Sequence, residues 1–570
     1  MRPHAKIPAF PARIPFVKTI PAPSTHPDLP LWRAVLEHPL FLGLLLLAPI
    51  VFLLPPLPID ETRYLAVAWE MRQTGEFLVP HLNGATYAHK PPLLFWLINA
   101  GWLLTGVHAW TGRAMTLLCS GLSLILLYRL TLRLTASVAA ARVSMWILLG
   151  AVYFAAFANA IMFDVPLTTC VLLAMHGICD LAEGRARRGI VVTGVAIGLG
   201  ILVKGPVMLL DIAFVALGAP WWSDQLAGRR ARYFGAFALA ILLGAAIALG
   251  WAIPAALHGG TDYARAIFLN QTLDRIEAVQ GASTHARPLW WYLAIFPLML
   301  LPWPLVIRGS WSKLRALADQ PALRMALVWV VPTFVAFSLV GGKQPHYLLP
   351  VIPGVALALA FALDRGALRV RVGLLALVLV AIGLAMALLP RFSAARPALA
   401  YVGDISPWWG IAVIALGMGL LAGMRRLAQP MWPALAMVML ALLVKLAVIE
   451  GTGERYDIEA IASRIRDAQE RGQPIAHLGW HHGVYEFAGR LTSPLTALNS
   501  EEEFKAWAQQ HPDGLLVSFY RRYRFRAQPV YSQRFRGGEV SIWTARDALA
   551  SGIDPSIAHQ KESSEDASDE

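Results

Sequence analysis

The sequence predicts a polytopic α-helical membrane protein with a small α/β domain outside the membrane. Hydrophobic residues make up 57% of the 570 residues and charged residues only 15%, and the mean hydropathy is +0.53. This profile is typical of chains that cross a bilayer several times. Apolar stretches long enough to span recur along residues 36–450, and after residue 451 they give way to the patterns of a folded α/β domain.

The first 35 residues contain several basic residues and many prolines, and we expect them to form a cytoplasmic N-terminal tail. The apolar run that follows is about twenty residues long, which favours an uncleaved first span over a signal peptide. Including that run, the sequence predicts about thirteen spans, near residues 36–55, 112–133, 143–160, 165–181, 189–203, 205–220, 234–256, 289–307, 325–341, 346–363, 372–389, 406–424 and 431–449.

The basic residues predict the orientation. The formal net charge of +13 is concentrated in alternate connections, and connections rich in Arg and Lys face the cytoplasm. A nucleic-acid-binding patch would not be divided among every second connection, so we expect no nucleic-acid partner. The basic connections contain Arg129/Arg133/Arg142, Arg185/Arg187/Arg188, Arg229/Arg230/Arg232, Arg308/Lys313/Arg315/Arg324, Arg365/Arg369/Arg371 and Arg425/Arg426.

The first outer loop, residues 56–111, contains an ambiguous segment. Residues 91–106 are apolar but short, and two prolines open the segment. We predict an interfacial or re-entrant helix here, because the segment is shorter than a typical span. A short, buried true span is the alternative, and it would reverse every later connection.

The outer connections also gather the unusual polar residues of the chain. Cationic side chains at a membrane boundary can hold a lipid-borne phosphate, and a carboxylate can accept a proton or orient an acceptor. Alternatives remain open: Asp164 could cap a helix, Lys204 could snorkel, and Lys343 with Tyr347 could anchor the interface. The candidates are Asp60, Glu61, Arg63, Tyr87, His89, Lys90, Asp164, Lys204, Arg275, Lys343, His346 and Tyr347.

The C-terminal part predicts a periplasmic α/β domain over residues 451–545. Residues 457–480 have a helical period followed by a strand-like run, and residues 512–522 contain a second buried strand. Residues 546–570 form an acidic, Ser-rich tail that we expect to be disordered. The three cysteines all lie in apolar runs, which gives no sign of a disulfide framework or a thiolate metal site.

Several separated motifs carry a family resemblance. "DETRYLAVAWEM", "YAHKPPLLFWL", "FDVPLTTCVLL", "GLGILVKGPV" and "GGKQPHYLLPVIP" resemble the ordered motifs of the GT-C membrane glycosyltransferases. More narrowly, they are similar to bacterial lipid A aminoarabinose transferases, which are relatives of the protein O-mannosyltransferases. The resemblance implies inverting transfer of a sugar, 4-amino-4-deoxy-L-arabinose or another, from undecaprenyl phosphate to lipid A or a related envelope acceptor, at the periplasmic face of the bacterial inner membrane.

The same resemblance implies roles for individual residues. Asp60 and Asp164 match the catalytic carboxylates, with Glu61 beside them, and a second group matches the donor phosphate site: Lys90, Arg63, Tyr87 and, in the long outer loop, Arg275. Substrate contacts are implied for Lys204, Lys343, His346 and Tyr347. His89 stands where the aminoarabinose transferases commonly have a glutamate that is implicated in metal binding. A divalent metal such as zinc, magnesium or manganese therefore remains open as a cofactor, with His89 as its ligand or as a simple hydrogen-bonding residue.

Two other functions remain open. One is a protein or glycan O-glycosyltransferase of the same architecture that takes mannose or another sugar from a polyprenyl phosphate carrier. The other is a lipid transporter or flippase, whose polar residues would lie near the middle of the bilayer. The candidate residues here fall in outer connections instead, which favours a membrane enzyme that handles an anionic lipid at the outer face. The resemblance implies a polyprenyl phosphate sugar donor, an envelope acceptor and membrane lipids as its partners.

Overall fold

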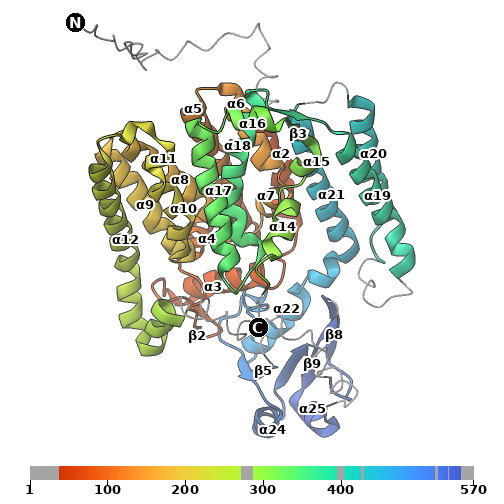
Figure 1. Ribbon diagram of the computed structural model, residues 1–570. Coiled ribbons are helices and arrows are strands. Elements are labelled where there is room, and N and C mark those ends of the chain that lie inside the picture. Colours follow the sequence, from red (N-terminus) through yellow and green to blue (C-terminus); the bar gives the residue numbers. More distant parts are fainter. Residues whose placement is uncertain are drawn as a thin grey trace, which may run out of the picture.

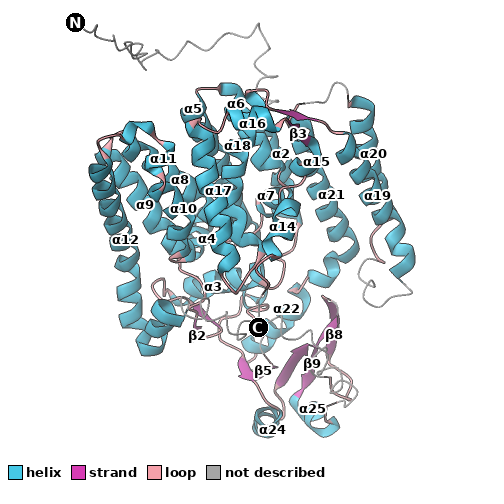
Figure 2. Ribbon diagram, viewed as in Figure 1, coloured by secondary structure: helices cyan, strands magenta, loops and turns pink. Residues whose placement is uncertain are grey.

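The computed structural model describes residues 38–270, 287–393, 403–424, 429–479, 481–519, 524–536 and 538–553. A body of roughly parallel helices carries a small domain of mixed structure at one end (Figure 1). Strands are concentrated in that domain, while the body is helical (Figure 2). The N-terminal tail expected from the sequence lies outside the described residues, and so does the expected acidic tail from residue 554 onward. Residues 546–551, which we expected to be disordered, belong instead to helix α25 (Ala545–Ser551), because Ala548 is buried in the C-terminal domain.

The prediction of a polytopic membrane protein is confirmed. Eight of the described helices are long and apolar enough to cross a membrane: α5 (Ala109–Thr135), α8 (Asp164–Ala182), α9 (Ala186–Lys204), α12 (Arg230–Arg265), α17 (Pro321–Leu339), the continuous stretch η4 (Pro345–Val351) and α18 (Ile352–Asp364), α19 (Gly373–Ser393) and α21 (Met431–Tyr456). Five shorter apolar helices accompany them: α2 (Pro39–Leu53), α4 (Leu93–Thr105), α6 (Val138–Gly150), α10 (Val207–Leu217) and α20 (Pro407–Gly423).

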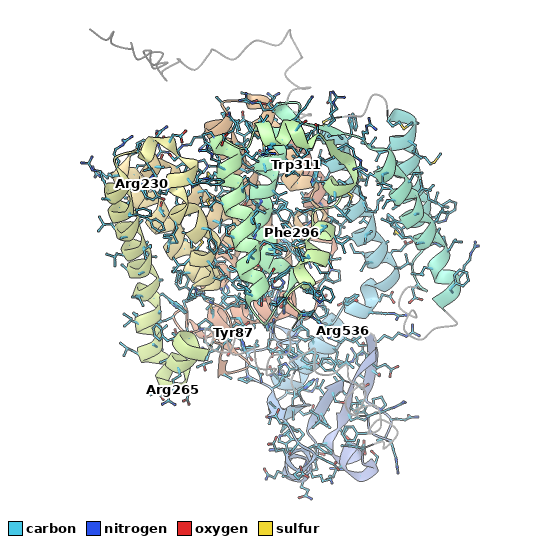
Figure 3. The ribbon with its side chains drawn as sticks, in the orientation of Figure 1. Tyr87, Arg230, Arg265, Phe296, Trp311 and Arg536 are labelled. Carbon is cyan, nitrogen blue, oxygen red and sulfur yellow. The ribbon has the colours of Figure 1, made fainter. Side chains whose placement is uncertain are left out.

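Basic connections and the first outer loop lie at opposite ends of the body. Arg230 and Trp311 are at the end away from the C-terminal domain, whereas Tyr87 and Arg265 are at the end near it (Figure 3). The far end also holds a two-stranded antiparallel sheet, β3 (Ile307–Gly309) with β4 (Leu368–Val370), and helix α16 (Trp311–Ala316). The fold therefore separates the two sides that the charge pattern separates.

Two stretches that we expected as continuous spans, 143–160 and 289–307, are broken. The amide of Val152, at the first break, donates to the carbonyl of Leu301, at the second break, over 2.7 Å. Non-helical backbone at membrane depth persists only where other protein groups satisfy it, so each break compensates the other. The broken pairs are α6 with α7 (Val152–Phe157), and α14 (Trp291–Met299) with α15 (Trp303–Val306).

The first outer loop folds along the end that carries the C-terminal domain. Helix α3 (Asp60–Thr74) runs across that end (Figure 1) and is followed by a hairpin, β1 (His81–Leu82) and β2 (Ala85–Thr86). Helix α4 stays at the same end: the Trp96 indole donates to the Phe77 carbonyl over 2.9 Å, and Trp102 stacks on Phe487 of the C-terminal domain. These contacts fit the predicted interfacial helix.

The C-terminal domain is a five-stranded mixed sheet with helices on both faces, and the two strands expected from the sequence are confirmed as β5 and β7. The strand order is β6–β5–β7–β9–β8. Strand β5 runs parallel to β6 and β7, and β9 is antiparallel to β7 and β8. The elements are α22 (Glu459–Glu470), β5 (Ile475–Leu478), α23 (Glu486–Gly489), β6 (Thr496–Leu498), α24 (Glu501–Gln510), β7 (Leu515–Phe519), β8 (Tyr531–Phe535), β9 (Gly538–Thr544) and α25 (Ala545–Ser551).

Glu486, at the start of α23, is a buried carboxyl that we expect to make the stability of this domain depend on pH. Burial raises the pKa of the Glu486 carboxyl to about 7, so its stabilising contribution is complete below its ordinary pKa and is lost as the pH rises through 7. Between about pH 6 and pH 8.5, we expect the free energy of unfolding of the wild-type domain to fall by about 1 kcal/mol through this carboxyl, and Glu486→Gln to abolish that fall. Melting of the purified protein at both pH values measures this, with the exposed Glu502→Gln as control. An equal pH dependence in wild type and Glu486→Gln would contradict the prediction.

Candidate active site

Helix α3 begins with a small polar network. Asp60 is its first residue, and the Asp60 Oδ1 atom accepts hydrogen bonds from Arg63 Nη2 at 2.6 Å and from the Tyr64 hydroxyl at 3.0 Å. Positions three and four apart lie on the same face of a helix, so the motif aligns the three side chains. The Asp60 side chain is 48% exposed, and no side chain caps this helix through its backbone amides. The carboxylate is thus held by side chains and remains accessible.

Glu61 points in another direction and is only 4% exposed. Its Oε1 atom accepts from Arg113 Nε at 3.0 Å and from the Ile161 amide at 3.0 Å, and its Oε2 atom accepts from the Leu57 amide at 2.9 Å and from Arg113 Nη2. Burial opposes its charge, but Arg113 and the two amides hold the pKa of the Glu61 carboxyl below its ordinary value. Arg113 and the Ile161 amide belong to the helix bundle, so the bonds of Glu61 attach α3 to that bundle.

Asp164 and Lys204 form a buried ion pair. They are the first residue of α8 and the last residue of α9, two helices that pack side by side. Lys204 Nζ bonds to Asp164 Oδ1, and both side chains are at most 3% exposed. The Asp164 side chain makes no capping bond, and a lysine this deeply buried does not snorkel. The sequence left open that Asp164 caps a helix and that Lys204 snorkels; the structure shows the two side chains paired with each other instead.

The segment around η4 completes this part of the site. His346 Nε2 lies 4.0 Å from Asp164 Oδ2, and Lys204 Nζ lies 4.4 Å from the centroid of the Tyr347 ring. Lys343, from the same motif, is 2% exposed and donates to the Arg287 carbonyl over 2.9 Å. The structure thus brings His346 and Tyr347 to the Asp164–Lys204 pair, while the Lys343 ammonium is bound to backbone.

Aromatic rings connect the Asp60 network on α3 with the Asp164–Lys204 pair. Phe163 packs edge-on against Tyr64, with ring centroids 4.9 Å apart, and Lys90 Nζ lies 5.9 Å from the Phe163 centroid. Lys90 also lies within electrostatic range of Asp164. Tyr87 is buried, and burial raises the pKa of its phenol to about 12, so the hydroxyl stays neutral near pH 7. We call Asp60, Arg63, Lys90, Asp164 and Lys204 the outer cluster.

Sequence reasoning missed three residues of this region. Tyr64 follows Asp60 by one helical turn, a spacing that could have revealed it, whereas Phe163 gave no polar signal. Asp211 in α10 is 1% exposed and interacts electrostatically with Lys204, but it lies inside an apolar run and was not singled out. Arg275 lies outside the described residues.

The metal hypothesis gains no support from the fold. His89 is exposed, and its ring lies 5.3 Å from the Tyr87 ring. Across the residues that the structure describes, no three His, Cys, Asp or Glu side chains form a group that could hold a metal ion. The donor set for zinc or for an oxygen-liganded cation is therefore not assembled around His89 among the described residues.

The chemistry of the outer cluster follows from its charges. Two carboxylates and three cations lie at one end of a membrane protein, and the two ion pairs Asp60–Arg63 and Asp164–Lys204 fix four of them. A rigid arrangement of this kind can bind an anionic group and stabilise charge that develops on it, because its dipoles need not reorganise during the reaction. The accessible Asp60 carboxylate can orient a second substrate.

Comparison with known proteins identifies the family. A model of the dolichyl-phosphate-mannose-protein mannosyltransferase family matches residues 89–251. The undecaprenyl phosphate-α-4-amino-4-deoxy-L-arabinose arabinosyl transferase 1 of Pseudomonas fluorescens is 31% identical over 493 residues, covering 81% of this chain and 86% of that protein. The chain belongs to this arabinosyl transferase family. It is therefore a glycosyltransferase that uses a polyprenyl-phosphate sugar, as the sequence motifs indicated.

Other relatives and solved structures extend the likeness. The arabinosyl transferase of Edwardsiella ictaluri is 31% identical over 315 residues, which cover 54% of this chain and 55% of that protein. The crystal structure of ArnT from Cupriavidus metallidurans bound to undecaprenyl phosphate matches with a TM-score of 0.69 at 19% identity, covering 90% of this chain and 97% of that one. Its apo state gives 0.70 at 20% identity. The two structures confirm the arabinosyl transferase fold, including the small C-terminal domain.

The Glu61–Arg113 pair should be essential for stability. Arg113→Met leaves the buried Glu61 carboxylate without its counter-charge, and we expect a loss of about 3–5 kcal/mol. The exposed Arg142→Met should change stability by about 0.5 kcal/mol or less. Melting of the detergent-purified proteins compares the two, and similar melting temperatures would show that the pair does not anchor α3.

Proposed function

We propose that this protein transfers 4-amino-4-deoxy-L-arabinose from undecaprenyl phosphate to lipid A. The alignment over 493 residues with an arabinosyl transferase of that donor carries the proposal. The outer cluster supports it, because its cations suit the phosphate of the donor and its position at one end of the membrane body suits two lipid substrates. We further propose that the protein resides in the bacterial inner membrane with the outer cluster facing the periplasm, since the basic connections lie at the opposite end.

Lys90 and Arg63 are the residues that we assign to the donor phosphate. Lys90 lies in the loop before α4, partly exposed and with its ammonium over the Phe163 ring, where a compact ammonium can reach a phosphate at the membrane boundary. Arg63 is fixed by Asp60 at 2.6 Å, so its guanidinium is already oriented. As the bond between the sugar and the phosphate oxygen breaks, both cations stabilise the charge on the leaving phosphate.

Asp60 is the residue that we assign to the acceptor side. An acceptor hydroxyl would lose its proton to a positioned carboxylate during attack on the anomeric carbon. An acceptor phosphate of lipid A is already ionised and needs no base, so with that acceptor Asp60 would orient the sugar or its amine. The Asp164–Lys204 pair, with Tyr347 beneath Lys204, forms the fixed floor of the same region.

One observation favours a second candidate. The family model that matches residues 89–251 describes a dolichyl-phosphate-mannose-protein mannosyltransferase, and that range includes Lys90, Asp164 and Lys204. A protein or glycan O-glycosyltransferase would use the same donor chemistry with a hydroxyl acceptor. Lipid transport has less support, because the outer cluster lies at one end of the body.

Mass analysis of lipid A tests the proposal. We expect cells that express the protein in a background without other aminoarabinose transferases to carry lipid A with the added mass of an aminoarabinose residue, and cells that lack the protein to carry none. The pool of undecaprenyl-linked sugars is measured in the same extracts. Unmodified lipid A together with a glycosylated envelope protein would select the second candidate.

Asp60→Asn tests the catalytic carboxylate. The substitution keeps the size of the side chain and an acceptor for Arg63 and Tyr64 but removes the charge, so we expect normal folding and a fall in transfer rate of about 10² or more. The rate is measured with purified protein at equal expression. Glu70→Gln, a change about three turns further along the same helix, serves as control and should retain activity. Turnover at the wild-type rate in Asp60→Asn would remove Asp60 from the mechanism.

A further inference from the structure

Gly483 of the C-terminal domain packs directly behind helix α3. A Cβ atom at this position would lie 2.6 Å from Leu82 Cδ1, 3.1 Å from Ala66 Cβ and 3.5 Å from the Cα of Arg63. The φ angle of Gly483 is +73°, in the left-handed region that glycine adopts without strain. The backbone of the domain and the backbone of α3 can approach this closely only because position 483 has no side chain.

Further hydrogen bonds join the same surfaces. Trp69 Nε1, on α3, donates to the Leu491 carbonyl over 2.9 Å. The hairpin that follows α3 makes a reciprocal pair: Asn83 Nδ2 donates to the Leu495 carbonyl at 2.9 Å, and the Leu495 amide donates to Asn83 Oδ1 at 2.7 Å. The C-terminal domain is thus bonded to α3 itself and to the hairpin beyond it.

Arg490 contributes to the same interface from the side of the domain. We call this interface the seam; it joins the C-terminal domain at Gly483, Arg490, Leu491 and Leu495 to α3 and the hairpin at Arg63, Ala66, Trp69, Leu82 and Asn83. Its guanidinium lies 3.9 Å from the Phe487 ring and 5.4 Å from the Trp69 ring. Its Nη2 atom donates to the Val107 carbonyl over 2.8 Å. Phe487 belongs to the apolar core of the membrane body. The seam therefore combines apolar burial with directional bonds, which fixes an orientation as well as a contact.

Helix α3 is anchored on the membrane side and on the side of the C-terminal domain. The Glu61–Arg113 pair holds its first turn, and Asn99 Nδ2 of α4 donates to the Ala68 carbonyl over 3.0 Å. The Gly483 contact lies beside Arg63 and Ala66, and the Trp69 bond lies one turn further on. Since Arg63 has its guanidinium on Asp60 and its Cα against Gly483, a shift of α3 at this contact moves Asp60 and Arg63 relative to the rest of the outer cluster.

We infer that the C-terminal domain positions the catalytic helix for transfer, with Gly483 as a positioning residue that acts through the backbone of Arg63. The inference rests on the proposed function, because it takes Asp60 and Arg63 as working residues. A displacement of about 1 Å at reacting groups can cost about 10² in rate, so small movements of α3 should affect turnover strongly.

A pair of glycine variants tests this inference. Gly483→Ala places a methyl group against α3, whereas Gly472→Ala introduces the same backbone strain elsewhere in the domain, because Gly472 has a φ of +69° and nothing within 4 Å of its Cβ position. We expect kcat of Gly483→Ala to fall about tenfold or more. KM for the donor should change less than about threefold, because only one of the two cations assigned to the donor phosphate, Arg63, moves with α3, while Lys90 lies outside the helix and keeps its place. Gly472→Ala should behave as wild type. Activity is measured on the full chain with undecaprenyl-phosphate aminoarabinose and lipid A.

Hydrogen exchange provides a second readout that needs no substrate. We expect faster exchange of the amides of residues 63–71 in Gly483→Ala than in Gly472→Ala. Equal kcat in the two variants, or equal exchange of α3, would overturn the inference. If the wild-type protein does not use this donor, the proposed sugar is wrong. The exchange comparison then shows by itself whether the C-terminal domain holds α3 in place.

Two additional variants guard against misfolding of Gly483→Ala. Leu82→Ala combined with Gly483→Ala removes the side-chain atom nearest to the new methyl group and should restore part of kcat. Trp69→Phe keeps the aromatic ring but removes the bond to the Leu491 carbonyl, and it should lower kcat with little change in donor KM. Wild-type kcat in Trp69→Phe would count against positioning through the seam.

Discussion

The ion pair between Glu61 and Arg113 is the interaction on which the candidate active site depends. Besides Glu61, Arg113 binds the carbonyls of Leu54 and Pro55, and Glu61 also accepts the amide of Ile161. The pair therefore connects the end of α2, the first turn of α3, the start of α5 and the turn that leads to Asp164. A buried ion pair need not add net stability, but it requires one geometry, because either charge alone would be costly. That requirement fixes the position of the first outer loop relative to the helix bundle.

The site divides its charges between fixed and accessible positions. Asp164 and Lys204 are buried together, so they hold their places without help from water. Asp60 is half exposed and is oriented by Arg63 and Tyr64. An enzyme that takes a sugar from a polyprenyl phosphate has to admit that lipid from the side, and an accessible carboxylate beside a buried ion pair satisfies that demand. Preorganisation and access are thus supplied by different residues.

The sequence predicted the features that depend on local physics and missed those that depend on distant partners. Apolar length located the membrane helices, because the cost of burying polar groups is local to each stretch. The breaks near Ala151 and Leu300 could not be foreseen, because the amide freed at one is satisfied at the other. Motifs located Asp60 and Glu61 but could not separate their roles. Adjacent helical residues point about 100° apart, and only the position of Arg113 shows which one faces the bundle. Asp164 and Lys204 were found separately, although their places at the joined ends of two neighbouring helices explain why they meet.

The bond between Trp69 and Leu491 joins residues 422 positions apart in the chain. A ribosome that has completed α3 must therefore add most of the protein before the partner of that helix exists. Contacts between residues so far apart form late in folding, because the entropy of closing the loop is lost before the contact stabilises the fold. During synthesis the first outer loop is therefore held only by the membrane helices beside it. A nascent or truncated chain that ends before Gly483 would contain every residue of the outer cluster and yet lack the seam behind α3. Maturation of the catalytic end is in this way tied to completion of the polypeptide.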